Sequence, residues 1–156
     1  MRLKAMAKIN LGLDVLGKRE DGYHEVRMIM QTIRMYDILD IRKTRRPGIV
    51  LTTNLPFIPT DQRNLVYKAA QMLMEEFDVE EGLSIKLRKF SPVAAGMAGG
   101  SSDAAASFVG VNRMFHLGLT EEQLMERAVK VGADVPYCIM RGTALAEGIG
   151  EKLTRL

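Results

Sequence analysis

In the first sixteen residues of the chain, apolar or small side chains alternate with mostly polar ones. Leu3, Ala5 and Ala7 are each followed by lysine or methionine, and the same alternation continues through Leu11, Leu13 and Val15. A period of two is typical of a β-strand that buries one of its faces. The pattern therefore predicts one long strand, or two abutting strands, at the start of the chain.

Similar alternation, rich in β-branched residues, recurs four more times in the first ninety residues. It predicts strands over residues 24–33, 37–44, 48–53 and 82–90. A polar segment with two glycines, residues 17–23, is expected to form the turn before the first of these strands. Pro56 and Pro59 mark a loop after the third of them.

Helical spacing first appears in the middle of the chain. Leu65, Ala69, Leu73 and Phe77 recur every four residues, which predicts an amphipathic helix from about Asn64 to Phe77. A second helix is expected to begin near Ser101, since apolar residues from Ala104 to Phe115 fall on one helical face.

The last third of the chain mixes helix and strand signals. Thr120 and Gln123 form a capping-box pattern at the start of a third helix. Residues 136–140, 142–148 and 151–156 are expected to be short strands separated by glycine turns. The mixed order of helices and strands predicts an α+β fold.

Composition limits the kinds of protein that this chain can be. Its 156 residues, 47% of them hydrophobic, suffice for one domain with a real core. A single cysteine, Cys138, excludes an internal disulfide and fits a reducing compartment. A net charge of +3 is compatible with an anionic small ligand but is too weak to argue for nucleic acid. With no signal peptide or membrane span visible, we expect a soluble cytoplasmic protein.

The segment "SPVAAGMAGGSSDAAA", residues 91–106, is the strongest chemical signal. It joins a predicted strand to a predicted helix, and its small residues let a ligand approach the backbone. The free N–H groups of the helix start attract anions, and the hydroxyls of Ser101 and Ser102 can bind phosphate oxygens or a magnesium ion. The segment has neither the Gly-Lys-Ser/Thr of a P-loop nor G-x-G-x-x-G spacing. A phosphate cradle and a packing turn with a serine N-cap both fit it.

The same segment resembles the phosphate-binding loop of the GHMP kinases. Three further segments, "AKINLGLDVLGKREDGYHEV", "GADVPYCI" and "GTALAEGIGEKL", are similar in the same order to one branch of that family, which phosphorylates a cytidine-diphosphate-linked methylerythritol in non-mevalonate isoprenoid biosynthesis. The resemblance covers essentially the whole chain. It implies a fold like domain 2 of ribosomal protein S5, with ATP and Mg²⁺ as cofactors and that small molecule as substrate.

The resemblance also implies roles for individual residues. Asp134 in "GADVP" corresponds to the catalytic aspartate, and Lys8 in "AKIN" to its lysine partner. Asn10, Tyr23 and His24 correspond to substrate-binding residues, the last two at the cytosine. The expected ATP-binding residues are Asn64, Pro92, Val93, Ala94, Ala95, Gly96, Met97, Ala98, Gly99, Gly100, Ser101 and Ser102. The resemblance assigns no residue as a ligand of the Mg²⁺ ion.

Each of these assignments has a purely structural alternative. Asp134 could cap a helix, Lys8 could be a solvated strand residue, and Tyr23 a half-buried anchor with His24 on the surface. Asn10 could satisfy backbone groups, and Asn64 makes a good helix N-cap.

The chain also departs from the family pattern. Family loops are commonly richer in glycine than this one, which has alanine at 94, 95 and 98, and Arg141 stands where glycine is more usual. Family members continue into a second α+β domain, so residues 1–156 are expected to be the N-terminal ATP-binding domain, with the C-terminal domain absent. A homoserine or sugar kinase of the same family is an alternative, and so is an S5-like RNA-binding domain that uses the basic residues 42–46.

Overall fold

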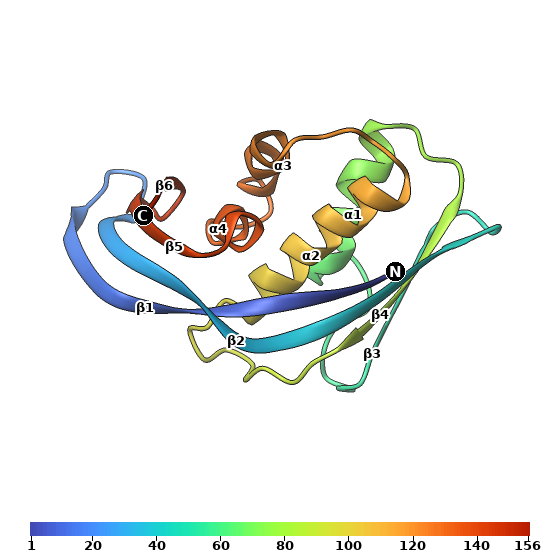
Figure 1. The fold of residues 1–156 in the computed structure, drawn as a ribbon, viewed down its shortest axis with the longest axis horizontal. Coiled ribbons are helices and arrows are strands. Elements are labelled where there is room, and N and C mark those ends of the chain that lie inside the picture. Colours follow the sequence, from blue (N-terminus) through green and yellow to red (C-terminus); the bar gives the residue numbers. More distant parts are fainter.

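The computed structural model describes residues 1–156, which form a sheet with four helices on one of its faces (Figure 1). The strands are β1 (Arg2–Lys18), β2 (His24–Thr44), β3 (Ile49–Thr53), β4 (Gly82–Arg88), β5 (Thr143–Gly148) and β6 (Lys152–Arg155). The helices are α1 (Leu65–Glu76), α2 (Gly99–Met114), α3 (Glu121–Ala128) and α4 (Val135–Met140). None of these helices is long and apolar enough to cross a membrane.

Strand β2 is the spine of the sheet. One of its edges pairs with β1 along most of its length. The other edge pairs with β5 over residues 26–31 and with β4 over residues 38–44. All of these pairings are antiparallel, and only β3 runs parallel to its neighbour, β4. One long strand therefore connects the two ends of the sheet, and β4 and β5 share its second edge.

The helices bury the apolar face of the sheet in a single core. Leu39 and Ile41 of β2 are buried there with Leu73 of α1 and Phe108 of α2. Helix α2 lies close to the sheet, because a Cβ added at Gly110 would come 2.5 Å from the Ile41 Cδ1 atom. This close packing holds the second half of α2 against the sheet.

Strand β1 is bent by three irregularities in its pairing with β2. The first lies between Met6 and Lys8, the second between Asn10 and Gly12, and the third between Val15 and Gly17. Bulges of this kind re-aim side chains and often lie beside active sites. At the first of them Ala7 and Lys8 are both buried, with 0% and 4% of their surface exposed. The bulge thus turns Lys8 toward the helices, whereas Lys4 on the regular part of the strand is exposed.

The structure confirms most of the predicted elements and corrects three. The helix at 64–77, the capping box of Thr120 and the strands at 142–148 and 151–156 are confirmed. The strands predicted at 24–33 and 37–44 are one continuous strand, β2. The segment 136–140, predicted as a strand, is helix α4, whose first turn holds a proline. Helix α2 begins at Gly99, two residues before the predicted start.

Candidate active site

The loop between β4 and α2 leaves the N-terminus of α2 free to bind an anion. Ala98 is the N-cap residue, it has left-handed backbone angles, and no side chain caps the helix. The N–H of Ser102 already bonds to the Ala98 carbonyl, at 2.7 Å. The amides of the first turn before it have no such partner, and together with the positive end of the helix they favour a negatively charged group.

Three residues of this loop hold left-handed backbone conformations at alternate positions. Their φ angles are 57° at Ala94, 71° at Gly96 and 54° at Ala98. Only glycine adopts such angles without strain. The glycines at 99 and 100 have ordinary helical backbone, so their small size serves the approach of a ligand. A Cβ at Gly100 would meet nothing within 4 Å, whereas one at Gly99 would come 3.1 Å from Ser91 Oγ.

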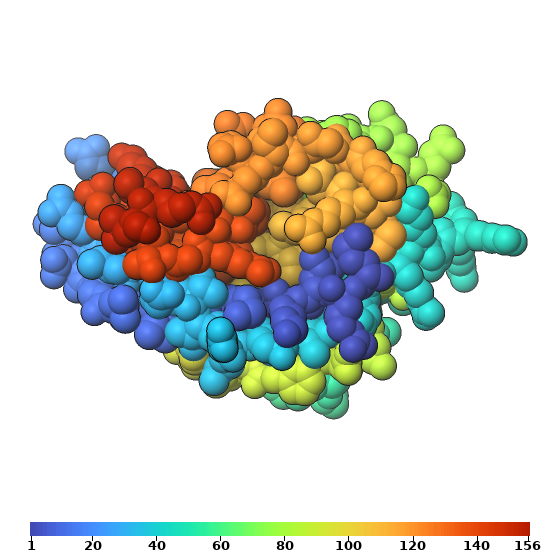
Figure 2. Space-filling model, in the orientation of Figure 1, coloured from blue at the N-terminus to red at the C-terminus, as the bar shows by residue number.

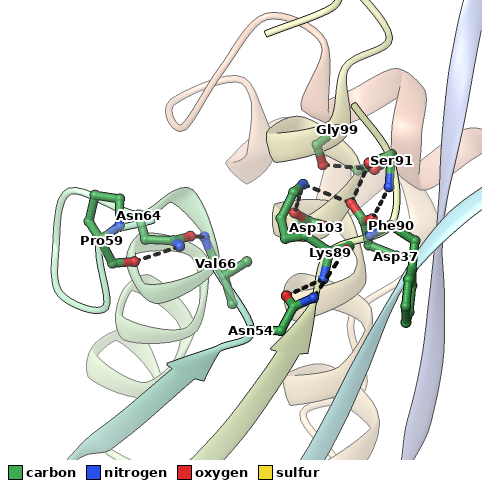
Figure 3. A network of polar contacts seen from close by, with 11 residues as sticks. Asp37, Asn54, Pro59, Asn64, Val66, Lys89, Phe90, Ser91, Gly99 and Asp103 are labelled. Atoms are coloured by element: carbon green, nitrogen blue, oxygen red, sulfur yellow. Dashed lines mark hydrogen bonds and ion pairs between the residues drawn. The ribbon is translucent and has the colours of Figure 1, made fainter. Parts of the chain in front are cut away.

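A small cavity of about 180 Å³ opens beside this loop. Asn64 borders it at the start of α1, and Lys89 and Asp103 lie behind the loop. The predicted ATP-binding residues on its wall are Asn64, Pro92, Val93, Ala94, Gly99 and Gly100. The Asn64 side chain caps α1, accepting from Val66 N–H at 2.9 Å and donating to the Pro59 carbonyl at 2.9 Å (Figure 3). Asn64 is thus an N-cap residue that also lines the cavity.

The three serines of residues 91–102, one in the loop and two in the first turn of α2, have different environments. Ser91 is buried and donates its hydroxyl to Asp37, at 2.6 Å. Ser102 is also buried, and its hydroxyl donates to the Gly99 carbonyl at 2.9 Å. The half-buried Ser101 uses its hydroxyl in no hydrogen bond within the chain. Of the two hydroxyls that the sequence suggested for phosphate or metal, that of Ser101 is therefore the available one.

Lys8 and Asp134 form an ion pair at the edge of the loop. The Lys8 Nζ atom lies 3.7 Å from Asp134 Oδ2 and 3.1 Å from Asn10 Oδ1. The Lys8 side chain is 5% exposed and that of Asp134 33%. Asp134 precedes α4 but makes no capping hydrogen bond with it, so its carboxylate is not engaged in holding the helix. The pair thus offers solvent a carboxylate that is backed by a buried ammonium group.

One backbone hydrogen bond joins this ion pair to the loop. The N–H of Lys8 donates to the carbonyl of Met97 at 3.1 Å, one residue before the N-cap of α2. Lys8, and through it Asp134, is therefore joined to the end of the loop, although more than thirty residues separate each of them from the loop in the sequence.

Cys138 lies one turn after Asp134 on α4, inside the core. Burial raises the pKa of its thiol to about 12, and the nearby Asp134 carboxylate adds to this effect. A thiol with such a pKa stays protonated at neutral pH and is a poor nucleophile. Cys138 therefore packs the core, one of the two places, packing or surface, that the sequence suggested for it.

A buried cluster of charges, which we call the loop anchor, lies under the loop and was not expected from the sequence. It consists of Lys89, Asp37 and Asp103 (Figure 3). Lys89 Nζ donates to both carboxylates at 2.7 Å. Asp37 also accepts the N–H groups of Phe90 and Ser91, at 2.6 and 2.7 Å. The anchor thereby ties the loop's first residues and the first turns of α2 to strand β2.

The two carboxyl groups of the loop anchor have opposite pKa shifts. Burial opposes ionisation of Asp37, but hydrogen bonds from Lys89 and Ser91 outweigh it and lower its pKa. Asp103 has fewer partners, and its Oδ1 atom is buried without any. Burial raises the pKa of Asp103 to about 8, with the Asp37 charge adding to the shift and Lys89 opposing it. The only hint in the sequence was a single carboxylate within a loop of small residues.

Tyr23 and His24 lie far along the β1–β2 hairpin from the ion pair. Tyr23 is 59% exposed, and His24, also exposed, pairs with Lys18 at the end of β1. Lys8 and Lys18 are ten residues apart, so the strand between them spans up to about 33 Å before its bends shorten it. The structure does not bring these two aromatic side chains into contact with Lys8 or Asp134. A ligand that touched both places would have to be long.

The residues present offer little to a metal ion by themselves. No group of three or more His, Cys, Asp or Glu side chains is placed to hold one. Asp103, near the start of α2, is buried against Lys89. A Mg²⁺ ion bound at this site would have the Ser101 hydroxyl as its available protein ligand and would add positive charge beside the free amides of α2.

Comparison with protein families identifies this arrangement. Residues 64–142, which contain α1, the loop, α2 and Asp134, match the model of the GHMP kinases N terminal domain. The chain belongs to the GHMP kinase family. This membership favours the kinase interpretation of the sequence over an RNA-binding one. The basic residues 42–46 lie at the far end of β2 and in the turn before β3.

Two curated relatives are similar to essentially the whole of this chain. It is 56% identical over 156 residues to the 4-diphosphocytidyl-2-C-methyl-D-erythritol kinase of Lachnospira eligens, covering 100% of the chain and 54% of the relative. It is 58% identical over 154 residues to the kinase of the same name from Lachnoclostridium phytofermentans, covering 99% of the chain and 53% of the relative. The chain thus spans about half the length of the curated relatives that it matches.

A solved structure agrees with the fold. A crystal structure of 4-(cytidine 5'-diphospho)-2C-methyl-D-erythritol kinase matches all of this chain with a TM-score of 0.87, at 35% identity, and the match covers 55% of that protein. The α+β fold like domain 2 of ribosomal protein S5, expected from the sequence, is therefore confirmed.

Proposed function

We propose that this chain is the ATP-binding half of a kinase that phosphorylates the 2-hydroxyl of 4-(cytidine 5'-diphospho)-2-C-methyl-D-erythritol. The names of the two relatives support this substrate. The proposal includes the domain arrangement, in which residues 1–156 form the N-terminal GHMP domain and a C-terminal domain completes the substrate cleft. It also includes Mg²⁺ as the partner of ATP.

The observation that carries the proposal is the position of the Lys8–Asp134 pair beside a free helix N-terminus. Transfer of a phosphoryl group to an alcohol requires a positioned hydroxyl and stabilisation of charge on the phosphate. Asp134 Oδ2 accepts or orients the proton of the attacking hydroxyl. Lys8, buried 3.7 Å away, orients the carboxylate and has an ammonium hydrogen left for the transferring group.

The loop and the first turn of α2 bind the triphosphate in this proposal. The amides near Gly99 and Gly100 donate to its oxygens, while the adenosine end lies toward the cavity bordered by Asn64 and Pro92. The Lys8 N–H bond to Met97 fixes the distance between the phosphates and the carboxylate of Asp134. Because such positioning is most of what phosphoryl transfer needs, the geometry suits a kinase.

Tyr23 and His24 bind the cytosine end of the substrate in this proposal. An exposed tyrosine ring can stack on a pyrimidine, and a histidine can stack or hydrogen-bond to a base edge. Their distance from Asp134 suits a substrate in which a diphosphate separates the base from the reacting alcohol. Asn10, already bonded to Lys8, lies where it can contact that alcohol.

The test offers several alcohols to the complete reading frame that contains these residues. With ATP and magnesium, ADP release is expected with the cytidine-diphosphate-linked methylerythritol and not with galactose, homoserine or mevalonate. Tyr23→Ala should raise the KM for that substrate by about 5- to 150-fold, because base–aromatic stacking contributes roughly 1–3 kcal/mol. The KM for ATP should not change. Preferential turnover of an alcohol without cytosine would overturn the substrate assignment and leave the kinase fold standing.

A further inference from the structure

A second cavity, of about 670 Å³, lies at the other end of α4 from Asp134. Figure 2 shows it as a hollow between the N-terminal residues in blue, the orange helices and the red-orange segment that follows α4. Leu3, Val109 and Ile139 contribute apolar wall, and Arg113 and Arg141 contribute positive charge. Its size is that of a small-molecule site.

The two arginines of this cavity have no acidic partner. Arg113 and Arg141 form no ion pair with any carboxylate of the chain. The one acidic residue on the wall, Glu121, is already paired with Arg155 at 2.8 Å. Arg2, at the rim, is paired with Asp40 at 2.7 Å. The positive charge of the two guanidinium groups is therefore not neutralised within the protein.

Arg141 is held at this wall by its side chain. Its Nη2 atom donates to the Lys4 carbonyl of β1 at 2.8 Å, which leaves most of its five N–H donors free for a ligand. Arg113 lines the same cavity as Arg141. Partial burial lowers the pKa of Arg141, and repulsion by Arg113 lowers it further. Two like charges facing one cavity favour an anion between them.

The backbone of Arg141 adds an independent observation. Its φ of 58° and ψ of 180° fall in a region that is essentially restricted to glycine. Strain of this kind persists where the surrounding structure or a function requires it, and here the strained residue carries an unneutralised guanidinium. A glycine at 141 would relieve the backbone but would remove the charge from the cavity.

We propose that this cavity binds a phosphate ester with an apolar portion, clamped by Arg113 and Arg141. Guanidinium groups match the geometry of phosphate oxygens, and the apolar portion lies against Leu3, Val109 and Ile139. Helix α4 has six residues and is therefore about 9 Å long. The bound ligand anchors one end of a short helix whose other end carries Asp134, so it also fixes the position of that carboxylate.

Calorimetric titration of the chain with hexyl phosphate tests the site. We expect one molecule to bind per chain, and inorganic phosphate to bind at least tenfold more weakly because it cannot use the apolar wall. Hexyltrimethylammonium, of similar length but opposite charge, should not bind. No binding of hexyl phosphate, or equal binding of inorganic phosphate, would contradict the proposal.

Variants distinguish binding of hexyl phosphate in this cavity from binding at the loop before α2. Arg113→Gln and Arg141→Gly should each weaken hexyl phosphate at least tenfold, while Gly100→Val and Arg45→Gln leave it unchanged. Arg141→Gly should also raise the melting temperature, since glycine accepts the backbone angles, which excludes misfolding as the cause of lost binding. Unchanged affinity in both arginine variants, or loss of affinity in Gly100→Val, would show that the anion binds elsewhere.

Discussion

At the scale of single residues, the strain of the candidate active site is concentrated in the loop before α2. Ala94 and Ala98 hold backbone angles that cost an L-residue about 1–2 kcal/mol each relative to right-handed ones. Ala95, between Ala94 and Gly96, has ordinary angles although it has the same side chain and is equally exposed. Glycine would therefore fit the backbone better than alanine at position 94 but not at position 95.

Replacing each of these alanines by glycine should change stability in opposite directions. Ala94→Gly relieves the left-handed angle but frees the unfolded chain, for a net gain of roughly 0.5–1 kcal/mol in the free energy of unfolding. In a chain of this size the melting temperature should then rise by about 1–4 °C. Ala95→Gly, the matched control, should lower stability by about 0.5–1 kcal/mol. Calorimetry or circular dichroism on heating measures both, and a loss in Ala94→Gly would disprove the strain.

The Lys8–Asp134 pair makes a separate prediction at this scale. In the complete kinase, Asp134→Asn should lower kcat by about 10²-fold or more, because an amide cannot accept a proton or carry the charge that Lys8 complements. The KM for either substrate should change little, since the amide preserves the shape of the side chain. Steady-state kinetics of the parent enzyme and the variant measure both kcat and KM. Unaltered turnover with weakened binding would make Asp134 a binding contact rather than a catalytic residue.

The burial of Lys8 could not be read from the pattern of its neighbours. Alternation places Leu3, Ala5 and Ala7 inward and would place Lys8 outward with Lys4. The bulge after Met6 reverses this order, and no glycine or proline in the sequence announces it. Only the motif "AKIN", through its resemblance to a family, pointed to Lys8. Gly100 at the start of α2 could be proposed from the sequence more directly, because its small size is visible there.

At the scale of elements, the loop anchor fastens β2, the end of β4 and the start of α2 together. Lys89 and Asp37 were not predicted as site residues, because their partners come from elements fifty residues apart in the chain. The same limit explains why helix α4 was predicted as a strand. The residues "PYCIM" fit a buried strand or a buried helix, and contacts with α2 and α3 decide for the helix. Elements with a clear period, such as α1, needed no such information.

The loop anchor makes stability depend on pH in a defined window. Asp103 has a pKa of about 8 in the folded chain and an ordinary carboxyl pKa, near 3.9, when unfolded. Between these values the folded state binds a proton that the unfolded state releases, so stability falls as pH rises from about 4 to about 8. The slope is at most about 1.4 kcal/mol per pH unit. The melting temperature measured from pH 5 to 9 should show this decline.

Two variants test whether Asp103 causes this decline of stability with rising pH. Asp103→Asn keeps the acceptor for Lys89 but cannot titrate, so its melting temperature should vary less between pH 5 and 9. The control, Asp61→Asn, removes an exposed carboxyl whose pKa is already lowered to about 2 by Arg63, and it should keep the slope of the parent chain. Equal slopes in the parent chain and the Asp103 variant would mean that this carboxyl group is ionised throughout.

At the scale of the whole molecule, one core serves both the sheet and all four helices. Twenty-nine buried residues form a single contiguous cluster. A chain with one core should unfold in a single cooperative transition, the same by far-ultraviolet circular dichroism and by tyrosine fluorescence. Two separate transitions would show that the β5–β6 end is an independent unit.

Binding of ATP should stabilise this whole unit. At 100 times the dissociation constant, ATP adds about 2.7 kcal/mol, which corresponds to a rise of roughly 5–11 °C in the melting temperature. Gly100→Val should abolish the rise, because its side chain fills open space at the N-terminus of α2. Gly12→Val, also at a glycine with open space but on β1, should retain it. An unchanged rise in Gly100→Val would place the nucleotide elsewhere.

The shared edge of β2 also bears on how the chain folds during synthesis. Ile38 pairs with Arg88, so that half of the sheet can form once β4 has left the ribosome. Val26 pairs with Gly148, and at 5–20 residues per second the other half waits several seconds longer for its partner strand. The nascent chain therefore contains the loop before α2, residues 89–98, before it contains Asp134. Until β5 has been synthesised, residues 26–31 of β2 have no partner strand on one edge. We expect chaperones to bind the nascent chain at this unpaired edge.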